Sequence, residues 1–145
     1  MLPKISIITP SFNQAGYLEQ TLQSVLGQNY PNLEYIVIDG ESSDGSQGII
    51  QNYSHRLTYW ESKKDSGQSQ ALNKGFRRAS GDIVGWLNSD DLLTPNCLRT
   101  VSSFFQQYPD TDFLYGRTTV FGGTHEITKG ANEAEMPFKA LAGMP

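Results

Sequence analysis

The sequence is poor in three features that identify common classes of protein: cysteine, long hydrophobic runs and positive charge. Its one cysteine, Cys97, has no partner in the sequence, which excludes an internal disulfide and fits a reducing cytoplasm. Apolar runs last for only about five residues, whereas a membrane-spanning helix needs about 20. The formal net charge of −4 argues against a nucleic-acid partner, because such a partner requires a basic surface.

A secretory signal is also missing, because Met1-Leu2-Pro3-Lys4 leads directly into an apolar segment with strand character. We therefore expect a cytoplasmic protein without a transmembrane segment. The 145 residues, of which 37% are hydrophobic and 18% charged, are enough for one globular domain with a buried core. We expect this single domain to span residues 1–145.

The two common phosphate-binding loops are absent as well. Thr9-Pro10-Ser11-Phe12-Asn13 stands after the first expected strand, where G-x-G-x-x-G would be found, and G-x-x-x-x-G-K-[ST] occurs nowhere. A bound phosphate would therefore need a different counter-charge, and a metal ion held by carboxylates could supply it.

What the sequence does contain is a regular alternation of two hydrophobic patterns. Apolar, β-branched segments predict strands over residues 4–9, 33–39, 57–60, 83–87 and 113–115, with 118–121 as a further candidate. Helical spacing follows over residues 17–26, 47–53 and 71–79. One more helix is predicted to start at Thr94 and Pro95, with the hydroxyl as N-cap and the ring in the first turn. The alternation predicts an α/β fold, with a mostly parallel sheet covered by helices on both faces.

Acidic side chains follow three of the predicted strands at their carboxyl ends. Asp39 ends the second strand, Asp65 follows the third, and Asp90 and Asp91 follow the fourth. Open α/β sheets bind their ligands in the crevice outside these strand ends. Carboxylates there could hold a divalent cation against a phosphate, so this edge is the predicted binding site.

Simpler interpretations of the same acids stay open. Adjacent aspartates such as Asp90 and Asp91 are common in turns, and aspartate followed by glycine is also a loop former. A calcium loop of the EF-hand type is excluded, because it needs glycine at its sixth position and glutamate at its twelfth. Counted from Asp39, those positions hold Asp44 and Ile50.

Other reactive side chains lack a partner at a useful spacing. We assign no catalytic function to His55 or His125, and we expect Cys97 to be an inert thiol on the buried face of its helix. Asn73 either reaches the crevice or is solvated. The last part of the sequence has three acids, none of which lies in a recognisable motif: Glu126, Glu133 and Glu135.

Taken together, these segments resemble the glycosyltransferases of family 2, which have the GT-A fold. Thr9 to Asn13 resembles the opening signature of that family, and Ile38 to Ser46 is similar to its segment Asp-Gly-x-Ser-x-Asp-Gly-[ST]. Four later segments match its central stretch and its metal motif: Asp65-Ser66-Gly67, Ala71-Leu72-Asn73-Lys74-Gly75, Ala79-Ser80-Gly81-Asp82 and Asn88-Ser89-Asp90-Asp91. The resemblance covers residues 4 to about 110 in the expected order.

The resemblance implies functions for individual residues. Pro10 and Asp39 would contact the base and ribose of a nucleotide, and Asp90 would coordinate Mn²⁺ or Mg²⁺ at the donor diphosphate, with Asp91 in support. The implied donor nucleotide-binding residues are Thr9, Pro10, Ser11, Asp39, Asp65, Gln68, Asn73, Ser89 and Asp90, and the implied metal ligands are Asp90 and Asp91.

Three departures from the family pattern stand out. Asn88 occupies the place of the first aspartate of the D-x-D motif, so the metal site has one charge fewer. Gln70 stands where many members have aspartate. Family members also run well beyond residue 145, so the general base is expected after Pro145 and the domain is expected to be truncated before the acceptor-binding part.

The resemblance therefore implies an inverting, metal-dependent transfer of sugar from a nucleotide-diphosphate-sugar, with a UDP-sugar favoured, to an acceptor hydroxyl. The acceptor would be a saccharide or a lipid-linked molecule in cell-surface polysaccharide or glycoconjugate biosynthesis, reached from the cytoplasm or peripherally at a membrane. A non-catalytic nucleotide-sugar-binding fragment is the alternative. A nucleotidyltransferase is a more distant one, because Ser11 to Gly16 lacks the basic residue of a triphosphate loop. The sequence indicates no oligomeric state.

Overall fold

The computed structural model describes residues 1–120 and 127–129 of the chain. The chain separates into two compact units, Met1–Ser103 and Phe104–Pro145. The prediction of one domain over residues 1–145 therefore stays a prediction, and each unit is described separately.

The first unit is built on a four-stranded sheet with the order β3-β2-β1-β4. Its strands are β1 (Ile5–Ser11), β2 (Leu33–Asp39), β3 (Tyr59–Ser62) and β4 (Ile83–Trp86). All three neighbouring pairs are parallel, so the carboxyl ends of the strands meet at one edge of the sheet. The predicted parallel α/β arrangement is confirmed.

Pro10 lies inside β1, although the sequence predicted that it would end the strand. The carbonyl of Ile8 accepts a hydrogen bond from the Leu87 N–H, so Ile8 and the residue two positions later face β4. The pairing of β1 with β4 ends at Ile8 and Trp86. Pro10 therefore faces a side on which its missing N–H removes no bond of the sheet.

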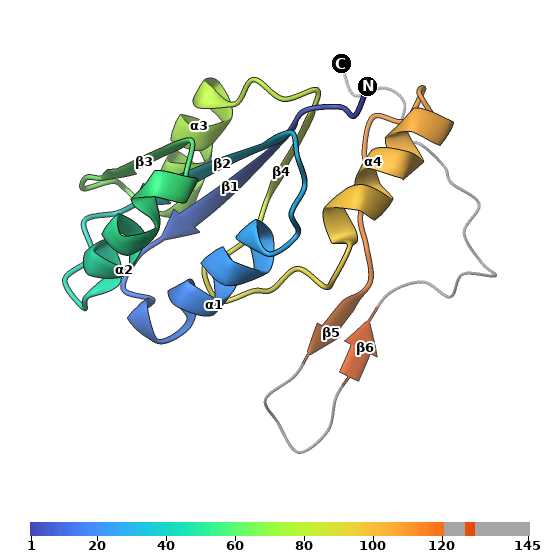
Figure 1. Cartoon of the computed structure of the whole chain (residues 1–145). Coiled ribbons are helices and arrows are strands. Elements are labelled where there is room, and N and C mark those ends of the chain that lie inside the picture. The colour runs from blue at the N-terminus through green and yellow to red at the C-terminus, as the bar shows by residue number, and fades with distance from the viewer. Residues whose placement is uncertain (121–126, 130–145) are drawn as a thin grey trace. The chain divides into compact units, whose positions relative to one another are not determined.

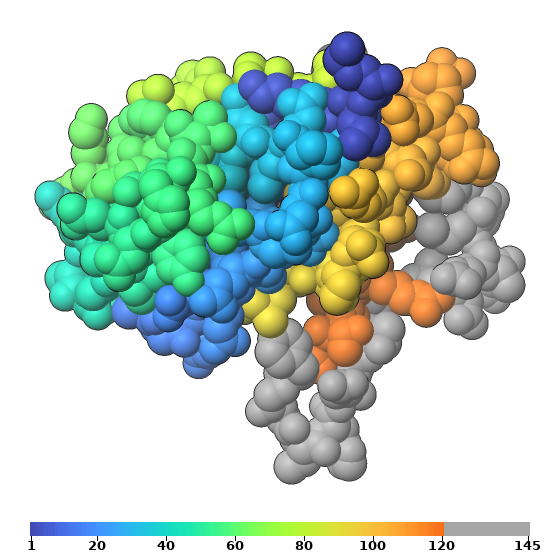
Figure 2. All heavy atoms as spheres, in the orientation of Figure 1, coloured from blue at the N-terminus to red at the C-terminus, as the bar shows by residue number. Residues whose placement is uncertain are grey.

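Helices cover both faces of the sheet, as Figure 1 shows for α1 and α2 on one side and α3 on the other. The helices are α1 (Ala15–Leu26), α2 (Ser46–Tyr53), the 3₁₀ turn η1 (Ser54–Arg56), α3 (Gln68–Arg78) and α4 (Cys97–Gln107). In the space-filling view, the segments that carry α1 and α2 lie side by side (Figure 2). A hydrogen bond of 2.8 Å from Gln23 Nε2 to Tyr53 Oη joins them.

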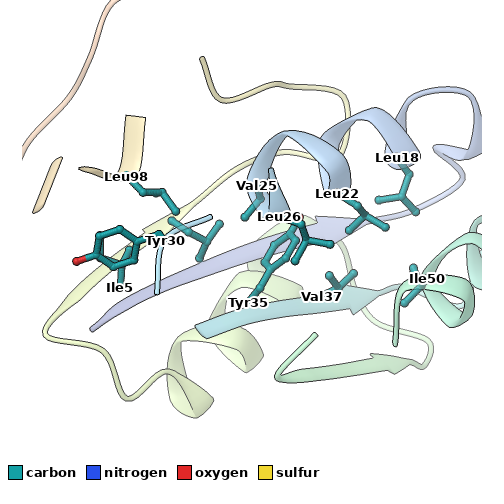
Figure 3. Packing of buried hydrophobic residues seen from close by; sticks show 11 residues of the cluster. Ile5, Leu18, Leu22, Val25, Leu26, Tyr30, Tyr35, Val37, Ile50 and Leu98 are labelled. Carbon is teal, nitrogen blue, oxygen red and sulfur yellow. The ribbon is translucent and has the colours of Figure 1, made fainter. Parts of the chain in front are cut away.

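The larger part of the core fills the space between the sheet and helices α1 and α2. Leu18, Leu22 and Val25 of α1 point toward Tyr35 and Val37 of the sheet (Figure 3). Each of these aliphatic side chains is fully buried, which stabilises the fold by about 1.5–3 kcal/mol per residue.

A smaller cluster lies on the opposite face, beneath α3. Ile8, Ile36 and Ile38 pack there with Ala71. A methyl group added at Gly75 would collide with the side chain of Ile8, so the approach of α3 to β1 requires glycine at this position. Successive side chains of β1 and β2 point to opposite faces of the sheet, so each face has an apolar surface on which helices pack.

The structure corrects two predicted elements. Helix α4 begins at Cys97 and not at Thr94, because Asn96 adopts a left-handed φ of 63° that interrupts the chain before the helix. The expected strand over residues 113–115 is not formed, whereas part of the further candidate is β5 (Thr118–Val120). In the second unit, β5 pairs in antiparallel fashion with β6 (Ile127–Lys129). Phe121, the last residue of that candidate, lies outside the described residues.

Among the helices of the described residues, none combines the length and the apolar character needed to cross a bilayer.

Candidate functional site

A cavity of about 720 Å³ lies at the carboxyl ends of the parallel strands in the first unit. We call this end of the sheet the C-terminal rim and the opposite end the N-terminal rim. The cavity is lined by residues that follow all four strands of the sheet: Pro10, Ser11, Phe12, Gln14, Gly40, Glu41, Lys64, Asp65, Gly67, Gln68, Ala71, Asn88, Ser89 and Asp90. Its position agrees with the general rule for ligand sites in open α/β sheets.

The end of β1 brings a buried hydroxyl group to the cavity. Ser11 is only 4% exposed, and its Oγ is the one fully buried side-chain polar atom without a hydrogen-bond partner among the described residues. Its backbone carbonyl is held by a 2.8 Å hydrogen bond from the Gly40 N–H. Because a buried hydroxyl without a partner is unfavourable, Ser11 Oγ is a natural contact for a polar atom of a ligand.

The next residue, Phe12, presents an aromatic ring to the cavity. Its side chain is 61% exposed although it directly follows the buried end of β1. A Cβ atom built at Gly40 would lie 3.2 Å from this ring, so glycine there leaves room for it. An exposed ring of this kind can stack on the face of a nucleotide base.

Asp39 lies behind the cavity and not on its surface. The residue is fully buried. Its Oδ1 accepts a hydrogen bond of 2.5 Å from Ser42 Oγ, and its Oδ2 accepts bonds of 2.9 Å from the Ser42 N–H and 2.6 Å from Ser62 Oγ. The carboxylate is thus satisfied within the protein, and its predicted contact with the base or ribose has no support from this geometry.

Thr9 is buried in a similar way. Its Oγ1 lies 3.0 Å from Tyr35 Oη, and neither group lines the cavity. Burial raises the pKa of the Tyr35 phenol, so the phenol stays protonated and the pair forms a neutral hydrogen bond. In this structure Thr9 supports the end of β1.

The loops after β1 and β2 are tied together at the rim. Asn13 donates its N–H to Ser42 Oγ at 2.8 Å and accepts the Ser43 N–H at 3.0 Å. Asp44 accepts the N–H of Ala15, the first residue of α1, at 2.8 Å. This hydrogen bond, together with one from Ser46, lowers the pKa of the Asp44 carboxyl group. The Asp44 carboxylate therefore holds the rim loops together and does not line the cavity.

The loop between β3 and α3 supplies a charged wall of the cavity. Asp65 lines the cavity and accepts the N–H of Gly67 at 2.9 Å through Oδ1. Gly67 has a φ of 116°, a conformation that favours glycine, so the loop turns here into α3. Lys64 also lines the cavity. Asn73 is exposed on α3 and does not line it.

The segment after β4 contributes Asn88, Ser89 and Asp90 to the cavity. Asn88 Oδ1 accepts a 2.6 Å hydrogen bond from Gln68 Nε2, and Asn88 Nδ2 donates one of 3.1 Å to Asp91 Oδ2. Asp91 does not line the cavity, and the hydroxyl of Thr21 on α1 holds its backbone carbonyl at 2.9 Å. Asp90 is exposed, and its carboxylate has no partner among the described residues.

A complete metal site made of protein groups alone is not present in the part of the chain that the structure describes. No group of three or more histidine, cysteine or acidic side chains is placed there to hold an ion. Mg²⁺, however, is often bound by one or two carboxylates, with phosphate oxygens and water as further ligands. Asp90 meets that requirement, whereas the Asp91 carboxylate is directed to Asn88.

Six of the predicted site residues thus meet around one cavity: Pro10, Ser11, Asp65, Gln68, Ser89 and Asp90. Thr9, Asp39, Asn73 and Asp91 do not line it. The functions predicted for all ten stay predictions. The histidine and the three acids singled out in the tail, His125, Glu126, Glu133 and Glu135, lie outside the described residues.

Eight cavity residues were not among the predicted site residues: Phe12, Gln14, Gly40, Glu41, Lys64, Gly67, Ala71 and Asn88. Phe12 directly follows the predicted Ser11, and Lys64 directly precedes the predicted Asp65. Adjacency to a predicted residue was thus the available signal. It does not show which side chain faces the crevice.

A second, basic hollow of about 390 Å³ lies beside β3 and α3 and is lined by Glu61, Lys63, Lys74, Arg77 and Arg78. Glu61 is shared there by two lysines, with Nζ–O distances of 3.6 Å to Lys63 and 3.4 Å to Lys74. Burial raises the pKa of Glu61, but the Tyr59 hydroxyl and the two lysines outweigh it and lower the pKa. The two lysines of this hollow therefore have Glu61 as a counter-ion.

Comparisons with known proteins agree with this architecture. A sequence profile described as "Glycosyl transferase family 2" matches residues 6–143. TuaG of Bacillus subtilis, a glycosyltransferase assigned to teichuronic acid biosynthesis, is 41% identical over 92 residues, which cover 61% of this chain and 36% of TuaG. The glycosyltransferase RT0329 of Rickettsia typhi is 37% identical over 112 residues, which cover 77% of this chain and 35% of RT0329. The chain thus spans about a third of the length of these relatives.

Two solved structures resemble the described fold. Residues 1–349 of S. aureus TarS in complex with UDP-GlcNAc give a TM-score of 0.67 at 25% identity and cover 73% of this chain and 32% of that one. The mannosyltransferase PcManGT of Pyrobaculum calidifontis, in complex with GDP-Man and Mn²⁺, gives a TM-score of 0.60 at 30% identity. That match covers 66% of this chain and 30% of PcManGT. The predicted GT-A-like fold is confirmed.

Proposed function

Because the chain belongs to glycosyl transferase family 2, we propose that its cavity binds the nucleoside diphosphate part of a sugar donor for transfer to an acceptor hydroxyl with inversion. The observation that carries the proposal is the cavity at the C-terminal rim, where the buried hydroxyl of Ser11 and the exposed carboxylate of Asp90 both lack partners among the described residues. Both groups are available to a ligand that is polar at one end and charged at the other.

The nucleoside end of the donor fits the side of the cavity formed by β1. The Phe12 ring offers an exposed face for stacking on a base, which contributes about 1–3 kcal/mol in other proteins. Ser11 Oγ can donate to or accept from a base or ribose atom and thereby remove its own unfavourable burial. UDP is the favoured nucleotide, in keeping with the UDP-GlcNAc bound to TarS, whereas PcManGT holds GDP-Man.

The diphosphate end fits the side formed by the segment after β4. Asp90 would hold a divalent cation, Mn²⁺ or Mg²⁺, together with oxygen atoms of the diphosphate. Such a cation stabilises the negative charge that develops on a departing diphosphate. Asn88 keeps Gln68 and Asp91 in place through its two hydrogen bonds. Asp91 is the weaker candidate ligand, because its carboxylate accepts one of them.

The acceptor half of the reaction needs a general base that deprotonates a hydroxyl group. We name no such residue in this chain, and our proposal concerns donor binding first. The alternative function, a nucleotide-sugar-binding fragment without turnover, shares the same cavity. Transfer or hydrolysis of a UDP-sugar in the presence of Mn²⁺ would favour the enzyme, and binding without turnover would favour the fragment.

The test is calorimetric titration of the chain with UDP, GDP and dTDP, with Mn²⁺ or with EDTA. We expect UDP to bind and Mn²⁺ to strengthen its binding. Asp90→Ala should abolish the effect of Mn²⁺ and leave the fold intact, because the side chain is exposed and makes no contact in the core.

Asp91→Ala is the matched control for that experiment, because it removes the adjacent carboxylate that does not line the cavity. It should lower the affinity in Mn²⁺ less than Asp90→Ala does. If none of the three nucleotides bound the unmodified chain, the proposal would be wrong. If Asp90→Ala kept the full effect of Mn²⁺, the metal function of Asp90 would be excluded.

A further inference from the structure

The charges that line the cavity do not favour a diphosphate on their own. Three acidic side chains face the cavity, Glu41, Asp65 and Asp90, and Lys64 is the one basic side chain among its lining residues. A diphosphate carries at least two negative charges, and like charges repel strongly where water is partly excluded. A bound donor therefore needs positive charge from a metal ion, from Lys64 or from both.

The site for a divalent cation has fewer available carboxylates here than the family pattern would give. Asn88 stands where the resemblance places an aspartate, and its amide is already engaged with Gln68 and Asp91. Asp90 is the carboxylate that stays available at this end of the cavity. One carboxylate with few protein partners holds a divalent cation less tightly than two.

Lys64 is the basic side chain that can make up part of this difference, reaching across the cavity from the loop after β3 at the opposite edge of the sheet from β4. It lines the same cavity as Asp90 and Asn88, and it forms no ion pair with any described residue. Its neighbour Lys63 lies in the basic hollow instead, where it pairs with Glu61 at 3.6 Å. Two consecutive lysines of the same loop thus have different surroundings, and of the two only Lys64 lines the cavity and has no described counter-ion.

We propose that Lys64 binds the diphosphate of the donor, so that nucleotide binding in this cavity persists in part without a divalent cation. The inference rests on the proposed function, since it assumes that a nucleoside diphosphate is the ligand. A lysine ammonium suits this task because it is a compact charge on a flexible stem with three N–H donors, which can follow phosphate oxygens of uncertain orientation. The hydrogen bonds formed would be charge-assisted and therefore stronger than those of Ser11.

The experiment compares Lys64→Ala with Lys63→Ala, two substitutions that remove the same charge from adjacent exposed positions. Calorimetric titrations with UDP and with uridine are run in Mn²⁺ and in EDTA. We expect measurable UDP binding by the unmodified chain in EDTA. Lys64→Ala should weaken UDP binding about tenfold in both conditions and leave uridine binding unchanged, because uridine has no phosphate.

The controls separate a direct contact from a general effect of charge. Lys63→Ala should change the affinity for UDP by less than about twofold, because its ammonium belongs to the basic hollow. Lys64→Arg should restore most of the binding. Circular dichroism and thermal unfolding of each variant show whether the fold is kept.

Three outcomes would overturn the inference while the proposed function stands. They are unchanged UDP affinity in Lys64→Ala, an equal loss of uridine affinity, and an equal loss in Lys63→Ala. A failure of the proposed function has a different result, because the unmodified chain would then bind none of the nucleotides. That outcome would overturn both.

Discussion

The two rims of the central sheet differ in how many of their polar groups have hydrogen-bond partners within the protein. At the N-terminal rim, the buried carboxylate of Glu34 accepts hydrogen bonds from Ser6 Oγ at 2.5 Å and from the N–H and Oγ of Ser80 at 2.8 Å each. Lys4 Nζ lies 2.9 Å from the same carboxylate. Ser6 Oγ also accepts the N–H of Gly81 at 2.8 Å. The charges and hydroxyls of this network are satisfied within the protein.

At the C-terminal rim, several polar groups have no partner among the described residues. Ser6 lies near the start of β1, and Ser11 is the last residue of the same strand. Both are buried, yet Ser11 Oγ has no hydrogen-bond partner among the described residues. Asp90 and Lys64 face the cavity without described counter-ions. The comparison shows that the polar groups of one rim are satisfied within the protein, whereas the other rim has polar groups that are open to the cavity. Unsatisfied groups gathered at one site are a common sign of function.

The largest effect that would test this comparison is expected at Glu34. Burial raises the pKa of its carboxyl group, but the hydrogen bonds from Ser6, Ser80 and Lys4 outweigh burial and lower the pKa from 4.5 to about 2. A shift of this size corresponds to about 3 kcal/mol of stability at neutral pH. We expect Glu34→Gln to lower the free energy of unfolding by about 2–3 kcal/mol, measured by urea denaturation at pH 7.

The same group predicts a pH dependence with a definite sign. Because the folded pKa lies below the unfolded one, the contribution of Glu34 is complete above about pH 4.5 and is lost as the pH falls toward about 2. The difference in stability between the unmodified chain and Glu34→Gln should therefore shrink over this range. A difference that stayed constant down to pH 2 would show that the network does not depend on the charge.

A second pair of variants compares one glycine at each rim. A Cβ atom at Gly81 would lie 2.6 Å from Ser6 Oγ, 2.7 Å from Ser6 N and 2.9 Å from the Ile83 carbonyl oxygen. Backbone atoms cannot move away as side chains do, so we expect Gly81→Ala to destabilise the fold by about 1–3 kcal/mol. Nucleotide binding at the opposite rim should be unaffected in the fraction that folds.

Gly40→Ala is the counterpart at the C-terminal rim. Its Cβ would meet the Phe12 ring at 3.2 Å and both carboxylate oxygens of Asp65 at 3.3 Å, and these side chains can shift. We expect a loss of stability below about 1 kcal/mol but a clear loss of UDP affinity, because Phe12 and Asp65 line the cavity. Urea denaturation and calorimetry on both variants check the contrast. Equal stability losses would contradict it.

A last pair of variants compares the two serines of β1, of which Ser11 is expected to have the smallest effect on stability. Ser6→Ala removes a hydrogen bond to Glu34 and leaves the Gly81 N–H without its acceptor, which should cost about 1–2 kcal/mol. Ser11→Ala removes a hydroxyl that has no partner, so the melting temperature should stay the same or rise slightly. UDP affinity should fall about threefold to tenfold in Ser11→Ala alone. A marked destabilisation by Ser11→Ala would show that its hydroxyl is not free.

Local pattern was sufficient for the long elements of the sheet. The segment over residues 33–39 was predicted with the bounds of β2, since it is a short run rich in β-branched residues that follows a turn. The helix at Thr94 was placed too early, because Asn96 takes a left-handed backbone conformation that Thr-Pro composition does not reveal. The expected strand over 57–60 lies two residues later, at Tyr59–Ser62. Its bounds follow from pairing with β2, a contact distant in sequence.

For the candidate site, too, some features follow from the local sequence and others do not. Strand ends are local features, so the sequence brought Ser11, Asp65 and Asp90 to one edge once a parallel sheet was inferred. The direction of each side chain is not local. Asp39 was predicted as a ligand contact, yet Ser42 and Ser62 turn its carboxylate inward. Lys64 was overlooked, yet it faces the cavity while Lys63 faces the neighbouring hollow.

The amino-acid sequence by itself determined the alternation of strands and helices, and with it the edge of the sheet at which the predicted site residues lie. Periodic burial and turn chemistry act over a few residues, so they can be read directly from the chain. Only the tertiary structure decided which polar groups at that edge are already satisfied and which are open. Hydrogen bonds such as those of Glu34 and Asp39 join segments 20 or more residues apart, and no local pattern contains that information.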